Sequence, residues 1–227
     1  MQIVNDDMRL LTLEDFRRIT GDRRVVPGSW RLLKRSMDLV FAGIALIFAL
    51  PIILLAAAAI IIVDRGAPFY SQVRVGLNGR RFRMLKLRTM VEGAHEMRKD
   101  LLHLNELEGP VFKIKNDPRL HPLGSFLRRT SIDELPNLFN VIRGDMSLVG
   151  PRPPLPSEVE HYTPYAMRRL TVMPGITCLW QISGRCSISF DEWMRLDNDY
   201  IDTWSPLNDL GILLKTIPAV IRKDGAH

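Results

Sequence analysis

An adjacent pair of carboxylates, Asp133-Glu134, lies where chemically useful residues concentrate in this chain. The pair is followed by a proline-rich loop, Gly150-Pro151-Arg152-Pro153-Pro154, and arginines surround it on both sides in the sequence: Arg128, Arg129, Arg143 and Arg152. Guanidinium groups near a helix N-terminus form a phosphate site. A carboxylate beside such a site can act as a nucleophile or as a metal ligand. The pattern therefore indicates a phosphoryl-transfer centre.

The same two carboxylates also fit a structural role. Pro136 and an apolar run follow them, as at the start of a helix, and acidic residues in a first turn favour the helix dipole. Ser131 with Glu134 has capping-box spacing, whereas Asp133 as the cap would place Pro136 where no backbone donor is needed. Composition alone favours capping. The surrounding arginines and the rigid loop favour chemistry.

A second candidate site lies between Pro174 and Arg185. Trp180, Gln181 and Arg185 stand in a glycine-bounded stretch that suits recognition of a base or a sugar. Trp180 fits a core position equally well.

The element that must position these residues is an apolar segment, Leu39 to Val63, of about 25 residues, long enough to cross a bilayer as a helix. Pro51 lies at its midpoint, where a bend is expected. Basic residues flank both ends, so both ends prefer the cytoplasm: Arg31, Lys34 and Arg35 before, and Arg65, Arg74, Arg80, Arg81 and Arg83 after. A re-entrant helix that breaks at Pro51 satisfies both flanks. A kinked spanning helix and a buried helix of a soluble core remain alternatives.

Three residues at the start of this segment are candidates for fixing its topology. Lys34 and Arg35 are expected to reach lipid phosphates, and Asp38 to pair with one of them.

The remaining pattern predicts a small mixed domain. Residues 67–75 and 82–87 indicate a hairpin around Asn78-Gly79. Apolar residues recur at helical spacing from Met90 to Leu104 and predict an amphipathic helix that ends near Gly109-Pro110. A short strand is expected at 111–114, a charged helix at 190–204, and an apolar-faced helix from Ser205 to the basic pair Arg222-Lys223. This last helix suits either the membrane interface or the core. A short helix within residues 12–20 has no assigned chemistry.

Composition limits the classes of function. The 31 basic and 25 acidic residues give a net charge of +6, which suits an anionic membrane surface or a phosphorylated substrate. No nucleic-acid recognition motif is present. Cys178 and Cys186 form neither a zinc pattern nor a disulfide framework, which indicates a reducing, cytoplasmic environment.

Several longer motifs resemble those of the bacterial sugar transferases, the monotopic polyprenyl-phosphate phosphoglycosyl transferases. The match runs in order from about Lys34 to Val220 and includes Lys34-Arg35-Ser36-Met37-Asp38, Gln72-Val73-Arg74-Val75-Gly76, Lys86-Leu87-Arg88-Thr89-Met90, Ser131-Ile132-Asp133-Glu134-Leu135-Pro136, Gly144-Asp145-Met146-Ser147-Leu148-Val149-Gly150-Pro151-Arg152-Pro153 and the stretch Pro174 to Arg185. The chain resembles the short form that serves exopolysaccharide assembly. Two positions depart from the family pattern: Leu50 replaces a serine often found there, and Cys178 replaces a glycine.

The resemblance implies transfer of a hexose 1-phosphate from a UDP-hexose to polyprenyl (undecaprenyl) phosphate, with Mg²⁺, at the cytoplasmic face of the inner membrane. Glucose or galactose is favoured as the sugar. Asp133 would be the covalent nucleophile, and Glu134 its partner in holding the metal or managing protons. Arg88, Arg128 and Arg152 would bind phosphates. A membrane-tethered scaffold that binds nucleotide or lipid without turnover is the alternative function.

The expected architecture is of the α/β type, mainly helical with a small β-hairpin or sheet. Residues 1–30 would form an extension, residues 31–65 the re-entrant membrane helix, and residues 66–227 a cytoplasmic catalytic domain with a C-terminal interfacial helix. The sequence leaves a homodimer open.

Overall fold

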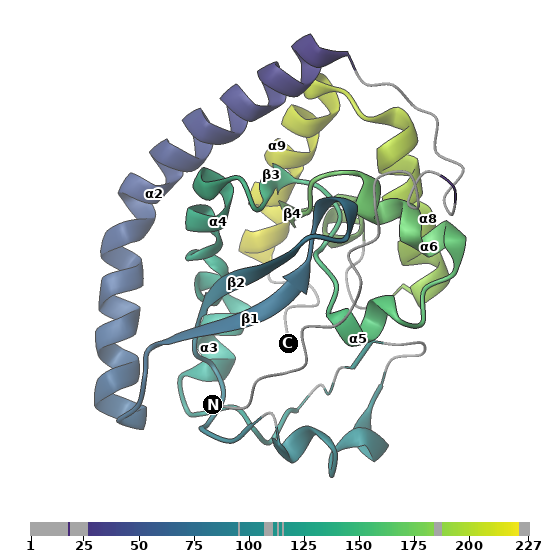
Figure 1. The fold of residues 1–227 in the computed structure, drawn as a ribbon. Helices are drawn as coiled ribbons and strands as arrows, with labels where there is room; N and C mark the ends of the chain where they lie inside the picture. Colours follow the sequence, from purple (N-terminus) through teal and green to yellow (C-terminus); the bar gives the residue numbers. More distant parts are fainter. Residues whose placement is uncertain are drawn as a thin grey trace.

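The computed structural model describes Arg18 and residues 27–94, 96–106, 111–112, 114, 116–183 and 188–222. The helix expected within residues 12–20 lies outside these residues, apart from Arg18. The described chain is mainly helical, with two small sheets beside one long N-terminal helix (Figure 1).

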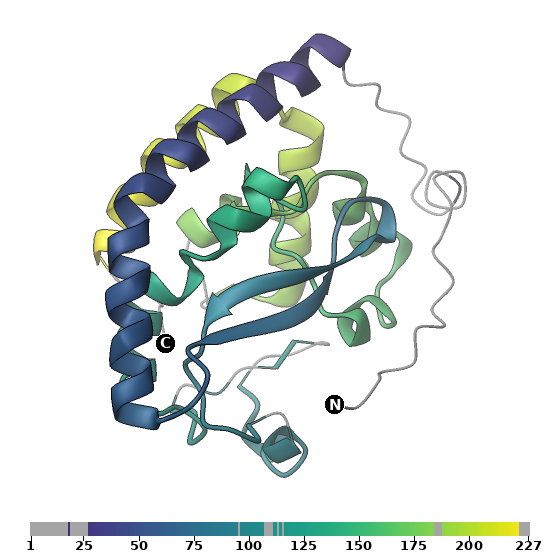
Figure 2. The same ribbon diagram turned by 60° about the vertical axis from the view of Figure 1, so that its left-hand side comes forward.

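The long helix, α2 (Gly28–Asp64), contains the apolar segment and bows around one side of the molecule (Figures 1 and 2). It runs without a break through Pro51, in place of the break expected there. A single proline removes only one backbone hydrogen bond, so a helix can bend at this position and still continue.

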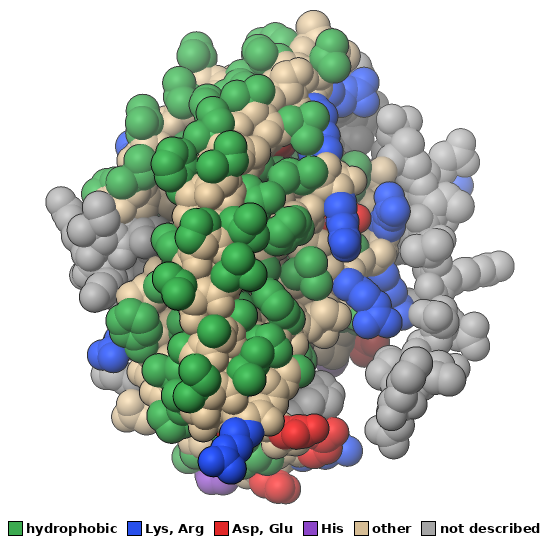
Figure 3. All heavy atoms as spheres, turned by 90° about the vertical axis from the view of Figure 1, so that its left-hand side faces the viewer, with side chains coloured by type: hydrophobic (Ala, Val, Ile, Leu, Met, Phe, Trp, Pro, Cys, Tyr) green, Lys and Arg blue, Asp and Glu red, His purple; other side chains and the backbone are tan. Residues whose placement is uncertain are grey.

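One stripe of α2 is buried, and it consists mostly of small residues: Ala42, Ala49, Ile53, Ala57 and Ile60. The other faces expose large apolar side chains, and Figure 3 shows them gathered over the surface of the helix. Soluble surfaces rarely carry so large an apolar patch. Within the described part of the chain, α2 is the one helix long and apolar enough to cross a membrane.

The expected hairpin is confirmed. Strand β1 (Phe69–Val75) pairs antiparallel with β2 (Arg81–Leu87), and the turn between them uses positive φ angles at Asn78 (54°) and Gly79 (77°). The register pairs Tyr70 with Lys86 and Arg74 with Phe82. Because side chains alternate along a strand, Tyr70, Gln72, Arg74 and Lys86 share one face of the hairpin.

The prediction of an amphipathic helix that begins at Met90 is wrong. The described residues there form only two short 3₁₀ turns, Glu96–Arg98 and Leu102–Leu104. The described residues of 111–114 form no strand. The regular apolar spacing of this segment does not reflect a helix, since Met90 and Ala94 line the wall of a cavity.

The rest of the domain consists of short helices around a second, parallel sheet, in which β3 (Ser147–Val149) pairs with β4 (Gly175–Thr177). The core contains side chains from α2, the hairpin, β3 and the C-terminal helices. The helices and 3₁₀ turns of this part are α3 (Gly124–Arg129), η4 (Ile132–Glu134), α4 (Asn137–Arg143), α5 (Pro156–Val159), α6 (Pro164–Met167), η5 (Arg168–Thr171), α7 (Leu179–Ile182), α8 (Phe190–Thr203) and α9 (Pro206–Arg222).

The two C-terminal helices were predicted correctly. Helix α9 buries Ile212 in the core and exposes other apolar side chains, so one face has the core role, and the interfacial role of the other face stays a prediction. The exposed residues are Leu207, Leu210, Leu214 and Ile217.

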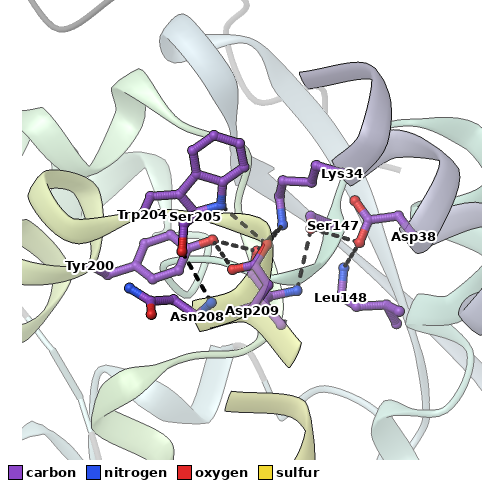
Figure 4. A network of polar contacts seen from close by, with 10 residues as sticks. Lys34, Asp38, Ser147, Leu148, Tyr200, Trp204, Ser205, Asn208 and Asp209 are labelled. Carbon is purple, nitrogen blue, oxygen red and sulfur yellow. Dashed lines mark hydrogen bonds and ion pairs between the residues drawn. The ribbon is translucent and has the colours of Figure 1, made fainter. Parts of the chain in front are cut away.

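The polar residues at the start of α2 face the protein, where lipid contacts were expected. Lys34 pairs with Asp209 of α9 and donates to the carbonyl oxygen of Val149 (3.1 Å), as Figure 4 shows for the Asp209 contact. Arg35 donates to the carbonyl oxygens of Val141 (2.6 Å) and Ile142 (2.8 Å) at the end of α4, where a cation is favourable.

Asp38 does not form the predicted ion pair. It accepts hydrogen bonds from the hydroxyl of Ser147 (2.9 Å) and the backbone amide of Leu148 (3.0 Å). At the other end of α2, Asp64 forms an ion pair with Arg88 (2.7 Å). Both ends of α2 are therefore fixed to the same domain by polar contacts.

Candidate active site

The carboxylate pair lies on the 3₁₀ turn η4. Ser131, just before the turn, has a left-handed backbone (φ 56°), which is unusual for a residue with a side chain. Helix α4 begins only at Asn137, after Pro136, and no described side chain caps it. Neither capping scheme considered for Ser131 and Asp133 is found, so the pair is not explained by helix capping.

The two adjacent carboxylates have opposite surroundings. Oε1 of Glu134 contacts Nζ of Lys86 at 2.6 Å and Nη1 of Arg152 at 3.5 Å. Asp133 is only 6% exposed, yet none of the described residues forms a hydrogen bond to its carboxylate. Both residues line one cavity. Glu134 is thus held in place, whereas the Asp133 carboxylate is free to meet a ligand.

These surroundings move the two pKa values apart. Burial raises the pKa of Asp133 to about 6, against the opposing effect of the Lys86 ammonium. For Glu134, burial raises the pKa, but Lys86 and Arg152 outweigh it and bring the pKa down to about 2. Divergent pKa values in neighbouring carboxyls are typical of functional sites.

The cavity has a volume of about 700 Å³ and combines a basic wall with an aromatic one. The hairpin contributes the polar face Tyr70, Gln72, Arg74 and Lys86. The aromatic wall contains Trp180 and Trp193, whose ring centroids lie 4.6 Å apart. A cavity of this size and composition suits a small ligand with both anionic and planar parts.

Arg152 reaches this cavity from the loop that follows β3. Gly150 and Gly175 approach so closely that a Cβ on either would collide with the other strand, and this contact fixes the loop where β3 meets β4. The carbonyl oxygen of Arg152 accepts from the buried Arg169 (3.0 Å), and that of Pro153 accepts from Arg74 (3.1 Å). The backbone of the loop is therefore held on both sides, which leaves the Arg152 side chain to the cavity.

The other predicted phosphate ligands also line the cavity. Nε of Arg128 donates to the hydroxyl of Thr89 (3.1 Å), and burial lowers the pKa of this guanidinium. Arg88 lines the cavity as well, but it already contacts Asp64 and the carbonyl oxygen of Ala67 (2.6 Å).

Not all of the predicted site residues gather here. Gln181 lines the cavity and accepts from the thiol of Cys178 (3.1 Å), whereas Arg185 lies outside the described residues. Arg129 and Arg143 are exposed and do not line the cavity. Cys178 has an extended backbone (φ −156°) that any residue adopts, so its replacement of a glycine needs no strain.

Sequence reasoning missed two cations of the site, Lys86 and Arg74. Lys86 contacts Glu134 across 48 positions of sequence, and no local pattern could pair them. Alternation along both strands, with the register of the hairpin, places Lys86 on the same face as Arg74.

Asp133 and Glu134 are the carboxylates of the cavity that could hold Mg²⁺. Among the described residues, no cluster of three or more acidic, histidine or cysteine side chains could hold a metal. Mg²⁺ usually takes one or two carboxylates together with substrate phosphates and waters. Two groups fit a site of that kind: the Asp133 carboxylate, to which none of the described residues donates a hydrogen bond, and Oε2 of Glu134, which no described contact uses.

The fold and the cavity define a class of protein: a membrane-attached domain with a buried carboxylate and several cations that face one pocket. Comparison with known proteins identifies the family. The model of the bacterial sugar transferases matches residues 29–223, and the chain belongs to this family.

Three relatives illustrate the range of matches. The chain is 44% identical to the galactosyl transferase CpsE of Streptococcus agalactiae over 97% of its own length and 49% of CpsE, so it spans about half of that protein. It is 42% identical to the exopolysaccharide production protein ExoY of Rhizobium meliloti, with 92% of each chain covered. It is 40% identical to the UDP-glucose:undecaprenyl-phosphate glucose-1-phosphate transferase of Caulobacter vibrioides, over 86% of this chain and 72% of the relative.

Proposed function

We propose that this protein transfers a hexose 1-phosphate from a UDP-hexose to undecaprenyl phosphate, at the cytoplasmic face of the inner membrane. The observation that carries the proposal is the buried Asp133 carboxylate, which lies in a cavity lined by Lys86, Arg128 and Arg152 and accepts no hydrogen bond from any residue that the structure describes. The name of the Caulobacter relative gives the donor, the acceptor and the group transferred. That of CpsE specifies galactosyl transfer, so glucose and galactose are the first sugars to test.

The proposed reaction has two steps. An oxygen of the Asp133 carboxylate attacks the sugar-bearing phosphorus, the bond from that phosphorus to the bridging oxygen breaks, and UMP leaves with the bonding electrons. An oxygen of the lipid phosphate then attacks the same phosphorus, and the Asp133 carboxylate leaves. The product is a polyprenyl diphosphate sugar, and the enzyme is restored.

The chain's own residues give each step its electrostatic support. A carboxylate with a pKa of about 6 is mostly ionised at neutral pH and more basic than an ordinary aspartate. Arg128 and Arg152 stabilise charge on the transferring group in a site shielded from water. Lys86 keeps Glu134 ionised and oriented next to the nucleophile. Mg²⁺, held by Asp133 and Glu134 with substrate phosphates, would neutralise phosphate charge.

The two-step route also has an electrostatic advantage. Both substrates are anionic, so a site that held them together would bring like-charged phosphates side by side. A covalent intermediate on Asp133 separates the two binding events in time and predicts ping-pong kinetics.

The test omits the lipid. Purified enzyme with the correct UDP-hexose should release up to one equivalent of UMP, and mass spectrometry should find a hexose phosphate on the peptide that contains Asp133. Asp133→Asn should form neither product while remaining folded. If UMP release requires polyprenyl phosphate and no adduct is trapped, transfer is direct. If no UDP-hexose releases UMP even with lipid present, the protein is a binding scaffold.

A further inference from the structure

The connection that follows α2 encloses the guanidinium of Arg88. Nη1 contacts the carboxylate of Asp64 at 2.7 Å, and Nε donates to the carbonyl oxygen of Ala67 at 2.6 Å. Gly66 packs so closely that a Cβ there would lie 2.4 Å from Nη2. Nη2 itself is buried and has no hydrogen-bond partner within the described part of the chain. The guanidinium is therefore held in place but not fully satisfied.

Arg88 lines the cavity and also forms an ion pair with α2, the apolar helix. Its partner Asp64 is the last residue of α2, while Lys86 and Arg74 lie progressively further along the same face of the hairpin. Successive side chains on one face of a strand are about 6.6–6.8 Å apart. The cations thus form a row that begins where the apolar helix ends and runs toward the Arg152 loop, to which Arg74 is bonded.

The two ends of this row suit different substrates. A phosphate attached to a lipid chain must approach from the end of α2, where Phe69 and Tyr70 are exposed. A soluble nucleotide has no such constraint and can occupy the part of the cavity near Arg152 and the tryptophan wall. Asp133 lines the same cavity as both regions.

We propose that Asp64 occupies the place of the acceptor's phosphate, and that Arg88 exchanges this carboxylate for the phosphate monoester of a polyprenyl lipid. This assignment rests on the proposed function. The exchange replaces one anion by another, so no cation is left buried without a counter-charge. A phosphate can accept from two nitrogens of a guanidinium and would satisfy Nη2, which Asp64 does not. The released Asp64 returns to water at the membrane surface.

Two substitutions test the exchange by opposite effects. Arg88→Gln removes the charge and should raise the KM for polyprenyl phosphate about tenfold or more, with a smaller effect on UMP release in the absence of lipid. Asp64→Asn removes the competing carboxylate and should lower that KM, about threefold or more. Asp199→Asn is the matched control, because it removes the carboxylate of an exposed ion pair with Arg195 and should leave the KM unchanged.

The competing explanation is that the ion pair only anchors the end of α2. In that case Asp64→Asn would resemble Arg88→Gln: both would lower the melting temperature and raise the acceptor KM. That result overturns the proposal. So would a loss of lipid-independent UMP release in Arg88→Gln as large as the loss of overall turnover.

A binding measurement separates this inference from the proposed function. Polyprenyl phosphate in phosphatidylcholine nanodiscs should bind wild-type protein more tightly than Arg88→Gln, whether or not any UDP-hexose is turned over. Inorganic phosphate and phosphatidylglycerol serve as competitors that distinguish a lipid phosphate monoester from a free anion or a general anionic surface. Equal displacement by phosphatidylglycerol, or equal binding by the two proteins, overturns the assignment.

Discussion

At the scale of single residues, the site depends on two neighbouring carboxyls with different surroundings. Glu134 is fixed by Lys86 and Arg152, and its pKa is low. Asp133 is buried without a hydrogen bond to its carboxylate from the residues described, and its pKa is high. This difference favours the proposed roles, with Asp133 as the nucleophile and Glu134 as the orienting residue, because a nucleophile must be both accessible to substrate and not already neutralised.

A buried carboxylate without a hydrogen bond should reduce stability, and this cost depends on pH. The pKa of Asp133 is about 6 in the folded state and 3.8 without burial, so between these pH values the folded state binds more protons. Stability therefore falls as pH rises through this window, and the full cost is present above pH 6.

Asp133→Asn should then be more stable than wild type at pH 8, by on the order of 1–3 kcal/mol, and no more stable near pH 4. Thermal denaturation in detergent without divalent cations measures the difference. Asp191→Asn, at an exposed position, is the control. A stability difference that is the same at both pH values would contradict the strained state assigned to Asp133.

At the scale of elements, the start of α2 is held against α9 by a buried polar network. Asp209 of α9 accepts from Lys34, from the Tyr200 hydroxyl (2.9 Å) and from Nε1 of Trp204 (3.1 Å), as Figure 4 shows. Lys34 and Tyr200 also donate to the carbonyl oxygen of Val149. Val149 ends β3, three residues before Arg152. The membrane helix therefore supports the strand that leads to the active-site loop.

Because Lys34 and Asp209 share one buried network, their contributions to stability should be coupled. Lys34→Met and Asp209→Asn are each expected to destabilise the protein, and the double variant should lose less than the sum, by about 1–3 kcal/mol. A double-mutant cycle of denaturation in detergent measures this coupling. The exposed pair Arg195–Asp199 is the control, with an expected coupling below about 1 kcal/mol. Additive effects for Lys34 and Asp209 would mean that their contact does not hold α2 against α9.

The sequence predicted those elements that local patterns determine. Alternation and Asn78-Gly79 located the hairpin, and apolar periodicity located α8 and α9. The same periodicity failed at residues 90–104, where chain packing against the cavity overrides local preference. Long-range partners could not be predicted: Lys34 was expected to reach lipid, and only the fold brings Asp209, 175 positions away, beside it.

The sequence predicted most residues of the candidate site, but it did not predict the contacts between them. Asp133, Glu134, Arg88, Arg128, Arg152 and Gln181 all line one cavity. Lys86 was missed because its role depends on a contact with Glu134, which is distant in sequence. Asp64 was missed because its partner, Arg88, follows a different element of the fold.

At the scale of the whole molecule, one face is apolar. The cavity lies in the domain that follows α2 in the sequence. The exposed side chains of α2 form most of this face (Figure 3), and α9, which contacts α2, adds its own exposed leucines. Lys34 and Asp64, near the two ends of α2, both contact the same domain. We therefore propose that α2 enters the bilayer and returns toward the side from which it came, with α9 in the interface.

This placement assigns a function to Pro51. A straight helix of 37 residues would be about 56 Å long, well beyond the roughly 30 Å of a bilayer core. Its two ends would then lie on opposite sides and could not both reach one domain. The bowed helix of Figure 1 avoids this, and Pro51, near its middle, is the residue that weakens the backbone there.

Pro51→Leu should therefore straighten α2 and produce molecules of mixed topology, in which some catalytic domains are translocated. The measurement is labelling with a membrane-impermeant thiol reagent, from each side of the membrane, of Asp202→Cys in a background without Cys178 and Cys186. Asp202 is exposed on α8, so a cysteine there is accessible wherever the domain lies. Leu50→Ile, at the adjacent exposed position, should keep one orientation. If Pro51→Leu also keeps a single orientation and full activity, then the polar contacts of Lys34, Asp38 and Asp64 determine the topology, and the proline does not.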